Sequence, residues 1–169
     1  MSKLAQKSGL VWLWLSLLLL VIDFATKTLV VNTMAYQESI NLLPVFSITY
    51  VHNYGAAYSF LSEAGGWQRW FFVTIGFVAV TYMIYLVCTN LNKKVFCLSL
   101  TFIIGGALGN LIDRIFLGVV TDFISVHLDE YYWPAFNMAD SFITIGAFLI
   151  LYDILRDSEN NVNAGIEKN

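Results

Sequence analysis

Charged residues are scarce in this chain: Asp, Glu, Lys and Arg make up 12% of its 169 residues, whereas hydrophobic residues make up 58% and aromatic residues 16%. A soluble globular domain has about 25% charged residues, which cover its surface. The mean hydropathy of +0.68 is likewise too high for a soluble domain of this length. The scarcity of charge therefore excludes a soluble domain and predicts an integral membrane protein.

Positively charged residues are scarcer than negatively charged ones. The chain has 9 Lys and Arg against 12 Asp and Glu, which gives a net charge of −3. These few cations form no basic patch that would bind phosphates. We therefore expect no nucleic-acid partner.

Four strongly apolar segments carry the hydropathy, at about residues 10–31, 67–89, 95–115 and 137–155. Each is close to the ~20 residues that a helix needs to cross ~30 Å of hydrocarbon. The fold class that we predict is an all-α polytopic membrane protein with four transmembrane helices. Residues 1–156 form its single membrane-embedded domain.

The first segment also has the alternative of a cleaved signal peptide, because Lys3 and Lys7 precede an apolar run. That run is too long, no persuasive small-residue cleavage site follows it, and Asp23 and Lys27 interrupt it. We expect a retained helix.

Lys and Arg are absent from residues 32–66 and 116–136, which connect the segments on one side. On the other side, Lys3 and Lys7 precede the first segment, Lys93 and Lys94 join the second to the third, and Arg156 and Lys168 follow the fourth. The positive-inside rule then places both termini in the cytoplasm and both long loops outside.

Cysteine and histidine are few, with two of each. Cys88 and Cys97 fall at the cytoplasmic, reducing ends of their helices, so we expect packing residues and not a disulfide. His52 and His127 lie far apart in the sequence, and no Cys is expected outside, which argues against a zinc site.

The outer loop at residues 32–66 is long enough for structure of its own. Within it, residues 45–60 are rich in Tyr, Val, Ile, Thr and Phe with partial alternation, which predicts strands interrupted by a turn at Asn53–Gly55. We expect a small β-containing region outside the membrane. The polar, aromatic-free tail at 157–169 is expected to be a disordered cytoplasmic end.

Carboxylates gather at one depth of the predicted helices. Asp122 and Asp140 bracket a short polar loop between the third and fourth segments, and Asp113 ends the third. Asp23 lies about 20 Å along the first helix at ~1.5 Å per residue, which is the same depth. Two carboxylates close together share one proton, so that one acts as a base and the other as an acid, as in aspartic peptide hydrolysis. Spacing alone does not choose the pair among Asp113, Asp122 and Asp140.

Each of these polar or small residues also has a structural interpretation. Lys27 lies one turn after Asp23 and could form a local ion pair while its amine extends outward. Arg114 could simply neutralise Asp113. Asp122 and Asp140 could be an interfacial charge and a helix N-terminal charge. Close helix contact could explain Gly105, Gly106 and Gly109, and interhelical hydrogen bonding or helix capping could explain Asn110 and Asn137.

Five blocks of this sequence closely resemble the signature blocks of the bacterial lipoprotein signal peptidases, also called signal peptidase II. They are Asp23–Lys27 (DFATK), Asn53–Ser59 (NYGAAYS), Gly105–Arg114 (GGALGNLIDR), Gly118–Phe123 (GVVTDF) and Phe136–Asp140 (FNMAD). The blocks are in the expected order and cover the four-helix layout. The visible departure is Tyr58, where the family often has Phe, which should affect packing and not chemistry.

The resemblance implies an aspartic endopeptidase of the bacterial inner membrane. Such an enzyme removes signal peptides from prolipoproteins at the periplasmic face, cutting before a cysteine that already carries diacylglycerol. Asp122 and Asp140 would be the catalytic pair. The residues that would bind substrate or support the site are Asp23, Lys27, Asn53, Gly55, Gly106, Asn110, Asp113, Arg114 and Asn137. The resemblance implies no metal, no cofactor and no acyl-enzyme, and we expect a monomer in contact with membrane lipid.

Three other classes compete with this interpretation. A small proton-coupled transporter would also use membrane carboxylates, but its site is expected near the midplane, whereas the acids here gather at one end. A presenilin-type protease would carry a Gly-x-Gly-Asp block, which the sequence lacks. A scaffold protein would not explain the dense polar blocks.

Overall fold

The computed structural model describes residues 10–55, 65–129 and 131–166. It contains four long helices: α2 (Leu10–Thr33), α3 (Trp67–Thr89), α4 (Lys94–Phe116) and α5 (Met138–Ile166). Each has an apolar stretch long enough to cross a membrane, which confirms the four predicted helices.

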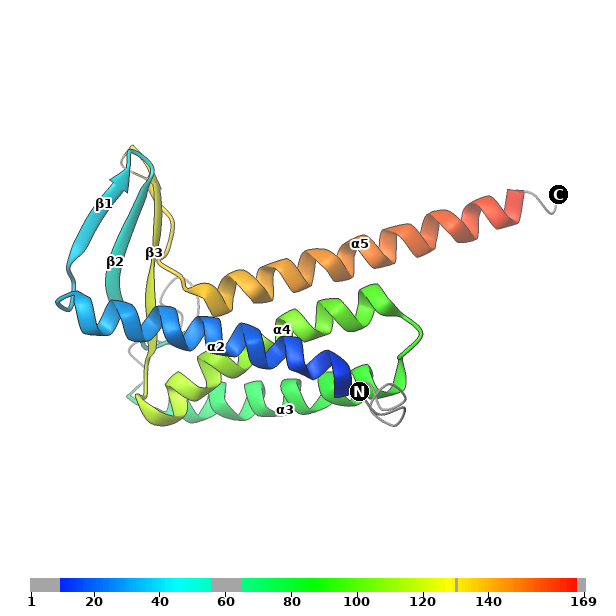
Figure 1. The fold of residues 1–169 in the computed structure, drawn as a ribbon, viewed down its shortest axis with the longest axis horizontal. Helices are drawn as coiled ribbons and strands as arrows, with labels where there is room; N and C mark the ends of the chain where they lie inside the picture. The colour runs from blue at the N-terminus through cyan, green and yellow to red at the C-terminus, as the bar shows by residue number, and fades with distance from the viewer. Residues whose placement is uncertain (1–9, 56–64, 130, 167–169) are drawn as a thin grey trace.

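The end of α5 differs from the prediction. We expected the fourth helix to stop near residue 155 and a disordered tail to follow, but α5 continues to Ile166 and extends away from the other helices (Figure 1). The expectation is wrong because residues 157–163 contain neither Gly nor Pro, so nothing in that stretch breaks the helix. Hydropathy marks only the end of the membrane-crossing part, at Asp157.

Helix α4 lies at the centre of the bundle and packs against α2, α3 and α5. Small residues on α4 permit the close approach. A Cβ atom on Gly105 would lie 2.9 Å from the Cβ of Leu19 in α2, and one on Gly106 would overlap the carbonyl oxygen of Ala139 in α5. Close helix contact at these glycines is therefore confirmed.

A small antiparallel sheet stands at the end of the bundle where α2 ends and α5 begins (Figure 1). Its strands, in spatial order, are β1 (Ser39–Leu43), β2 (Phe46–Asn53), β3 (Val120–Leu128) and β4 (Tyr131–Tyr132). Strand β2 confirms the strand expected in the outer loop as far as Asn53. Residues 56–60 of that expectation lie outside the described residues.

Strand β3 corrects the expectation of a short polar loop between the last two apolar segments. Its first four residues are all buried, on both faces. A strand buried on both faces shows no alternation of polar and apolar residues, so its pattern does not stand out in the sequence. On one face Phe123 packs against Val30 of α2 and against Met34, which follows that helix, and the opposite face carries Asp122.

Candidate active site

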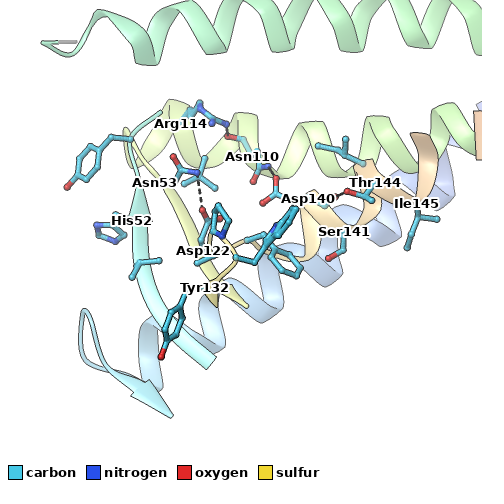
Figure 2. A pocket seen from close by; sticks show the side chains of 18 residues that line it. His52, Asn53, Asn110, Arg114, Asp122, Tyr132, Asp140, Ser141, Thr144 and Ile145 are labelled. Carbon is cyan, nitrogen blue, oxygen red and sulfur yellow. Dashed lines mark hydrogen bonds between the residues drawn. The ribbon is translucent and has the colours of Figure 1, made fainter. Parts of the chain in front are cut away.

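Asp122 lies in β3, and its side chain is held from two directions. The strand pairs with β2, where an extra residue between Ile48 and Val51 shifts the register by one beside Asp122. Asn53 of β2 donates from its Nδ2 atom to Asp122 Oδ2 at 3.0 Å (Figure 2). Asn137 donates from its Nδ2 atom to Asp122 Oδ1 at 2.6 Å. Asp122 is only 2% exposed.

Asp140 lies in the first turn of α5. Asn137, which precedes the helix, accepts the Asp140 N–H through its Oδ1 atom at 3.0 Å, and the Asn137 N–H donates to Asp140 Oδ2 at 3.2 Å. This reciprocal pair is a capping box, which satisfies N–H groups that a helix start leaves free. Asn110 of α4 donates to Asp140 Oδ1 at 2.7 Å. The capping interpretation of Asn137 is confirmed.

Asn137 joins the two carboxyl groups. Its side chain is fully buried, and its Nδ2 atom also contacts Asn110 Oδ1 at 3.1 Å. Asp122, Asn137, Asn110 and Asp140 therefore belong to one hydrogen-bonded network that spans β3, α4 and α5.

A buried ion cluster supports this network from behind. Lys27 Nζ lies 2.8 Å from Asp23 Oδ2, 3.0 Å from Asp113 Oδ2 and 3.0 Å from Asn110 Oδ1. Asp23 accepts the backbone N–H of Ala139 at 2.9 Å, and Asp113 accepts that of Thr121 at 3.2 Å. The cluster thus ties α2 and α4 to the backbone on which Asp140 and Asp122 are carried.

This arrangement corrects two structural interpretations. The Asp23–Lys27 ion pair is present, but Lys27 does not extend outward; it is 5% exposed and points into the bundle. Arg114 does not neutralise Asp113, which pairs with Lys27 instead. Arg114 donates to the carbonyl oxygens of Gly55 at 2.9 Å and Asn110 at 3.3 Å.

The turn after β2 brings Gly55 to Arg114. Asn53 Oδ1 accepts the Gly55 N–H at 3.0 Å, which confirms the predicted turn at Asn53–Gly55. Asn53 therefore uses one end of its amide to shape the turn and the other to bind Asp122.

A cleft of about 1180 Å³ opens beside the network. Both Asp122 and Asp140 line it, together with Asn53, Asn110 and Arg114 (Figure 2). The rest of the lining consists of Val51, His52, Tyr54, Val120, residues 132–136, Ser141 and residues 143–145. Four other predicted site residues are buried behind this surface: Asp23, Lys27, Asp113 and Asn137. Gly106 lies where α4 and α5 are in close contact.

Sequence reasoning missed two kinds of contributor. Thr121 and Ala139 act through backbone N–H groups, which no side-chain pattern reports. The cleft wall at residues 132–135 belongs to none of the five blocks, so its position was not foreseeable either.

Burial and charge set the protonation of Asp122. Burial and, to a smaller extent, the negative charge of Asp140 raise the pKa of Asp122 to about 7, although the amide hydrogen bonds from Asn53 and Asn137 and the charge of Lys27 oppose the rise. Near neutral pH this site therefore holds a readily exchanged proton. Burial lowers the pKa of His52 at the edge of the cleft.

Cys88 and Cys97 are free thiols. Within the described ranges, no group of three or more His, Cys, Asp or Glu side chains is arranged to hold a metal ion. The groups around the two aspartates in the cleft wall are the amides of Asn53 and Asn110 and the guanidinium of Arg114, which suit hydrogen bonding to a substrate.

Four membrane-spanning helices and two carboxyl groups in one network beside a cleft define a membrane-embedded aspartic peptidase. The model of the Signal peptidase (SPase) II family matches residues 15–156, and the chain belongs to this family. The predicted resemblance is thereby confirmed.

Two relatives illustrate the match. The lipoprotein signal peptidase of Pseudoalteromonas translucida is 64% identical over 157 residues, which cover 90% of this chain and 93% of that protein. The lipoprotein signal peptidase of Alteromonas mediterranea is 46% identical over 160 residues, covering 94% and 88%.

Solved structures agree with the fold. A bacterial membrane enzyme determined by the in meso method at 2.3 Å resolution has a TM-score of 0.79 at 31% identity, over 89% of this chain and 90% of that one. A second such structure, at 1.9 Å resolution, has a TM-score of 0.75 at 31% identity, over 87% and 94% of the two chains. The alternative of a proton-coupled transporter is not supported by these matches.

Proposed function

We propose that Asp122 and Asp140 are the catalytic pair with which this enzyme removes signal peptides from diacylglyceryl-modified prolipoproteins, cutting before the lipidated cysteine. The observation that carries the proposal is that both carboxyl groups line one cleft and share Asn137 as a hydrogen-bond partner. Such a pair can hold one proton and one water between them.

The chemistry is general acid–base hydrolysis. An ionised aspartate takes a proton from the water as its oxygen attacks the scissile carbonyl carbon, and a protonated aspartate donates to the carbonyl oxygen. The leaving amine then receives a proton as the C–N bond breaks. This path requires no nucleophilic side chain and forms no covalent acyl-enzyme.

The remaining site residues fall into two groups by their position. We propose that Asn53, Asn110 and Arg114, which line the cleft, contact the substrate backbone. The buried groups Asp23, Lys27, Asp113 and Asn137 hold the strands and helices that carry the pair, and Gly106 sets the spacing of α4 and α5. Gly55 positions the Arg114 guanidinium through its carbonyl oxygen.

The substrate reaches this site laterally from the bilayer. The lining of the cleft includes Ile143 and Ile145 of α5 and the aromatic residues Trp133 and Phe136. An apolar wall suits acyl chains and an apolar signal helix, and anchoring in the membrane raises the effective concentration of the scissile bond at the carboxyl pair.

We propose that the sheet and the cleft face the periplasm of the bacterial inner membrane and that both termini are cytoplasmic. The distribution of Lys and Arg supports this orientation, because Lys93, Lys94 and Arg156 gather around one small pocket at the opposite end of the bundle. A membrane-impermeant thiol reagent should label Tyr131→Cys, which is 84% exposed in the wild type, in intact cells. It should not label Lys94→Cys; both variants carry Cys88→Ser and Cys97→Ser. Labelling of Lys94→Cys and not of Tyr131→Cys would show that the protein has the opposite orientation in the membrane.

We also propose that the enzyme acts as a monomer, since one chain supplies all the hydrogen-bond partners of both carboxyl groups described above. The mass of the active detergent-solubilised species tests this, and activity confined to a dimer would contradict it.

The central experiment is cleavage of a diacylglyceryl-modified prolipoprotein by purified protein in detergent. Asp122→Asn and Asp140→Asn should each abolish the shortened product while thermal unfolding shows a folded protein. Asp157→Asn, which changes an exposed carboxylate at the far end of the membrane-crossing part of α5, is the matched control and should cleave normally. Unlipidated substrate should remain uncut. Cleavage by either site variant would overturn the assignment of the pair.

A further inference from the structure

The two carboxyl groups of the site stand on different kinds of backbone. Asp140 is the third residue of α5, at the N-terminal end of the helix, where its Oδ2 accepts the Asn137 N–H at 3.2 Å. A helix N-terminus carries about half a positive elementary charge, which stabilises a carboxylate. Asp122 lies within the sheet in β3, and sheets have only small net dipoles.

The two carboxyl groups also differ in their exposure to water. Asp122 is 2% exposed, whereas Asp140 is half-buried and forms part of the cleft wall. An ionised carboxylate loses more stabilisation the further it is removed from water. Burial therefore disfavours the charged form of Asp122 more strongly than that of Asp140.

Neighbouring charges add to the difference. The charged groups that act on Asp122 are Lys27 from α2, Arg114 from α4 and Asp140 from α5, while Asp113 of α4 accepts the N–H of the neighbouring residue Thr121. Lys27 is already bound by Asp23 at 2.8 Å and by Asp113 at 3.0 Å. Arg114 attracts Asp140 more strongly than Asp122. In the described part of the chain, Asp122 has no ion-pair partner.

We infer that the pair has fixed roles: in the resting enzyme Asp122 carries the shared proton and is the general acid, while Asp140 is ionised and is the general base. This inference rests on the proposed function and assigns each catalytic residue its half of the reaction. The raised pKa of Asp122 agrees with it.

The assignment gives a balanced sequence of proton transfers. Asp140 takes a proton from the water whose oxygen bonds to the scissile carbonyl carbon, and Asp122 gives its proton to the carbonyl oxygen, which forms a gem-diol. Asp140 then gives its proton to the nitrogen of the lipidated cysteine as the C–N bond breaks. Asp122 recovers a proton from a gem-diol hydroxyl, which leaves a carboxyl group on the signal peptide and restores both residues.

Infrared spectroscopy of the purified protein in detergent tests the assignment, because the C=O stretch of a protonated carboxyl group is separate from that of a carboxylate. Spectra of wild type, Asp122→Asn and Asp140→Asn are recorded as the pH is lowered through the Asp122 pKa of about 7. In wild type a protonated-carboxyl band should grow in through this range. In Asp140→Asn it should remain but grow in at lower pH, since the repulsion from Asp140 is gone.

In Asp122→Asn that band should be missing throughout the range, because Asp140 stays ionised. Asp157→Asn should match wild type. A band that survives in Asp122→Asn and is lost in Asp140→Asn would reverse the roles, and a band lost in both variants or in neither would show that Asp122 does not hold the proton alone. Either outcome overturns the inference.

The pH dependence of cleavage gives a second readout. The wild-type rate should fall as the pH rises through about 7, because the general acid loses its proton there. A rate that rises through this range would contradict the inference. Its failure is separable from failure of the proposed function: if either Asn variant cleaves substrate, the proposed function fails, whereas two inactive variants with a band on Asp140 refute only the role assignment.

Discussion

The contact between α4 and α5 at Gly106 sets the distance between the helices that carry Asn110 and Asp140. A Cβ atom at position 106 would overlap the carbonyl oxygen of Ala139, and it would lie 2.9 Å from Ile143 Cγ1 and 3.1 Å from the carbonyl carbon of Ala139. The Ile143 side chain can rotate away, but the Ala139 backbone belongs to the first turn of α5. Gly106→Ala must therefore push the start of α5 outward by roughly 1 Å, since non-bonded carbon atoms sit about 3.5–4.0 Å apart.

The expected loss follows from the hydrogen bond that crosses this interface. Asn110 Nδ2 and Asp140 Oδ1 are 2.7 Å apart, so a displacement of ~1 Å would stretch them beyond hydrogen-bonding distance. A misplacement of ~1 Å at a reacting group costs about 10²-fold in rate. Overpacking should also reduce the free energy of unfolding by about 1–3 kcal/mol. We expect Gly106→Ala to be folded, less stable and about 10²-fold slower.

Cleavage rates on diacylglyceryl-modified prolipoprotein, together with thermal unfolding in detergent, measure both effects. Gly76→Ala is the matched control: its new Cβ would lie 3.3 Å from a single movable atom, Leu111 Cδ1, so it should behave like wild type. The reasoning is refuted if Gly106→Ala cleaves at the wild-type rate, or if the control loses as much activity.

Three further predictions follow from the same structure. Asn53→Ala removes a hydrogen bond that stabilises ionised Asp122, so the pKa of Asp122 should rise above about 7 and the alkaline limb of the pH–rate profile should move to higher pH; a move to lower pH would contradict this. Lys27→Met leaves Asp23 and Asp113 buried without their cation and should lower the free energy of unfolding by about 3–5 kcal/mol. In denaturant titrations the exposed control Lys93→Met should be unchanged, and an equally stable Lys27→Met would disprove the role of the cluster. Truncation after Asp157 should leave the cleavage rate intact, because the cleft is lined by residues no later than Ile145; a large loss of rate would assign the tail a role in the site.

The sequence by itself determined that the protein lies in a lipid bilayer, that four helices cross it, and that carboxyl groups carry its chemistry. Four apolar runs near the length of a membrane span leave little choice of architecture, because backbone groups in hydrocarbon must be satisfied within a helix. The carboxylates at one depth, within ordered motif blocks, predicted an aspartic peptidase. These features depend on local composition and spacing, which a linear sequence records directly.

Only the tertiary structure decided how the polar residues pair. Asp113, Asp122 and Asp140 were equal candidates by spacing, and their environments differ only because Lys27 of α2 reaches Asp113 while Asn137 joins the other two. Strand β3 was hidden because its first residues are buried on both faces. Pair contacts and burial join residues far apart along the chain, and a carboxylate's role depends on the charges and water around it, which are defined only after the helices and the sheet have packed.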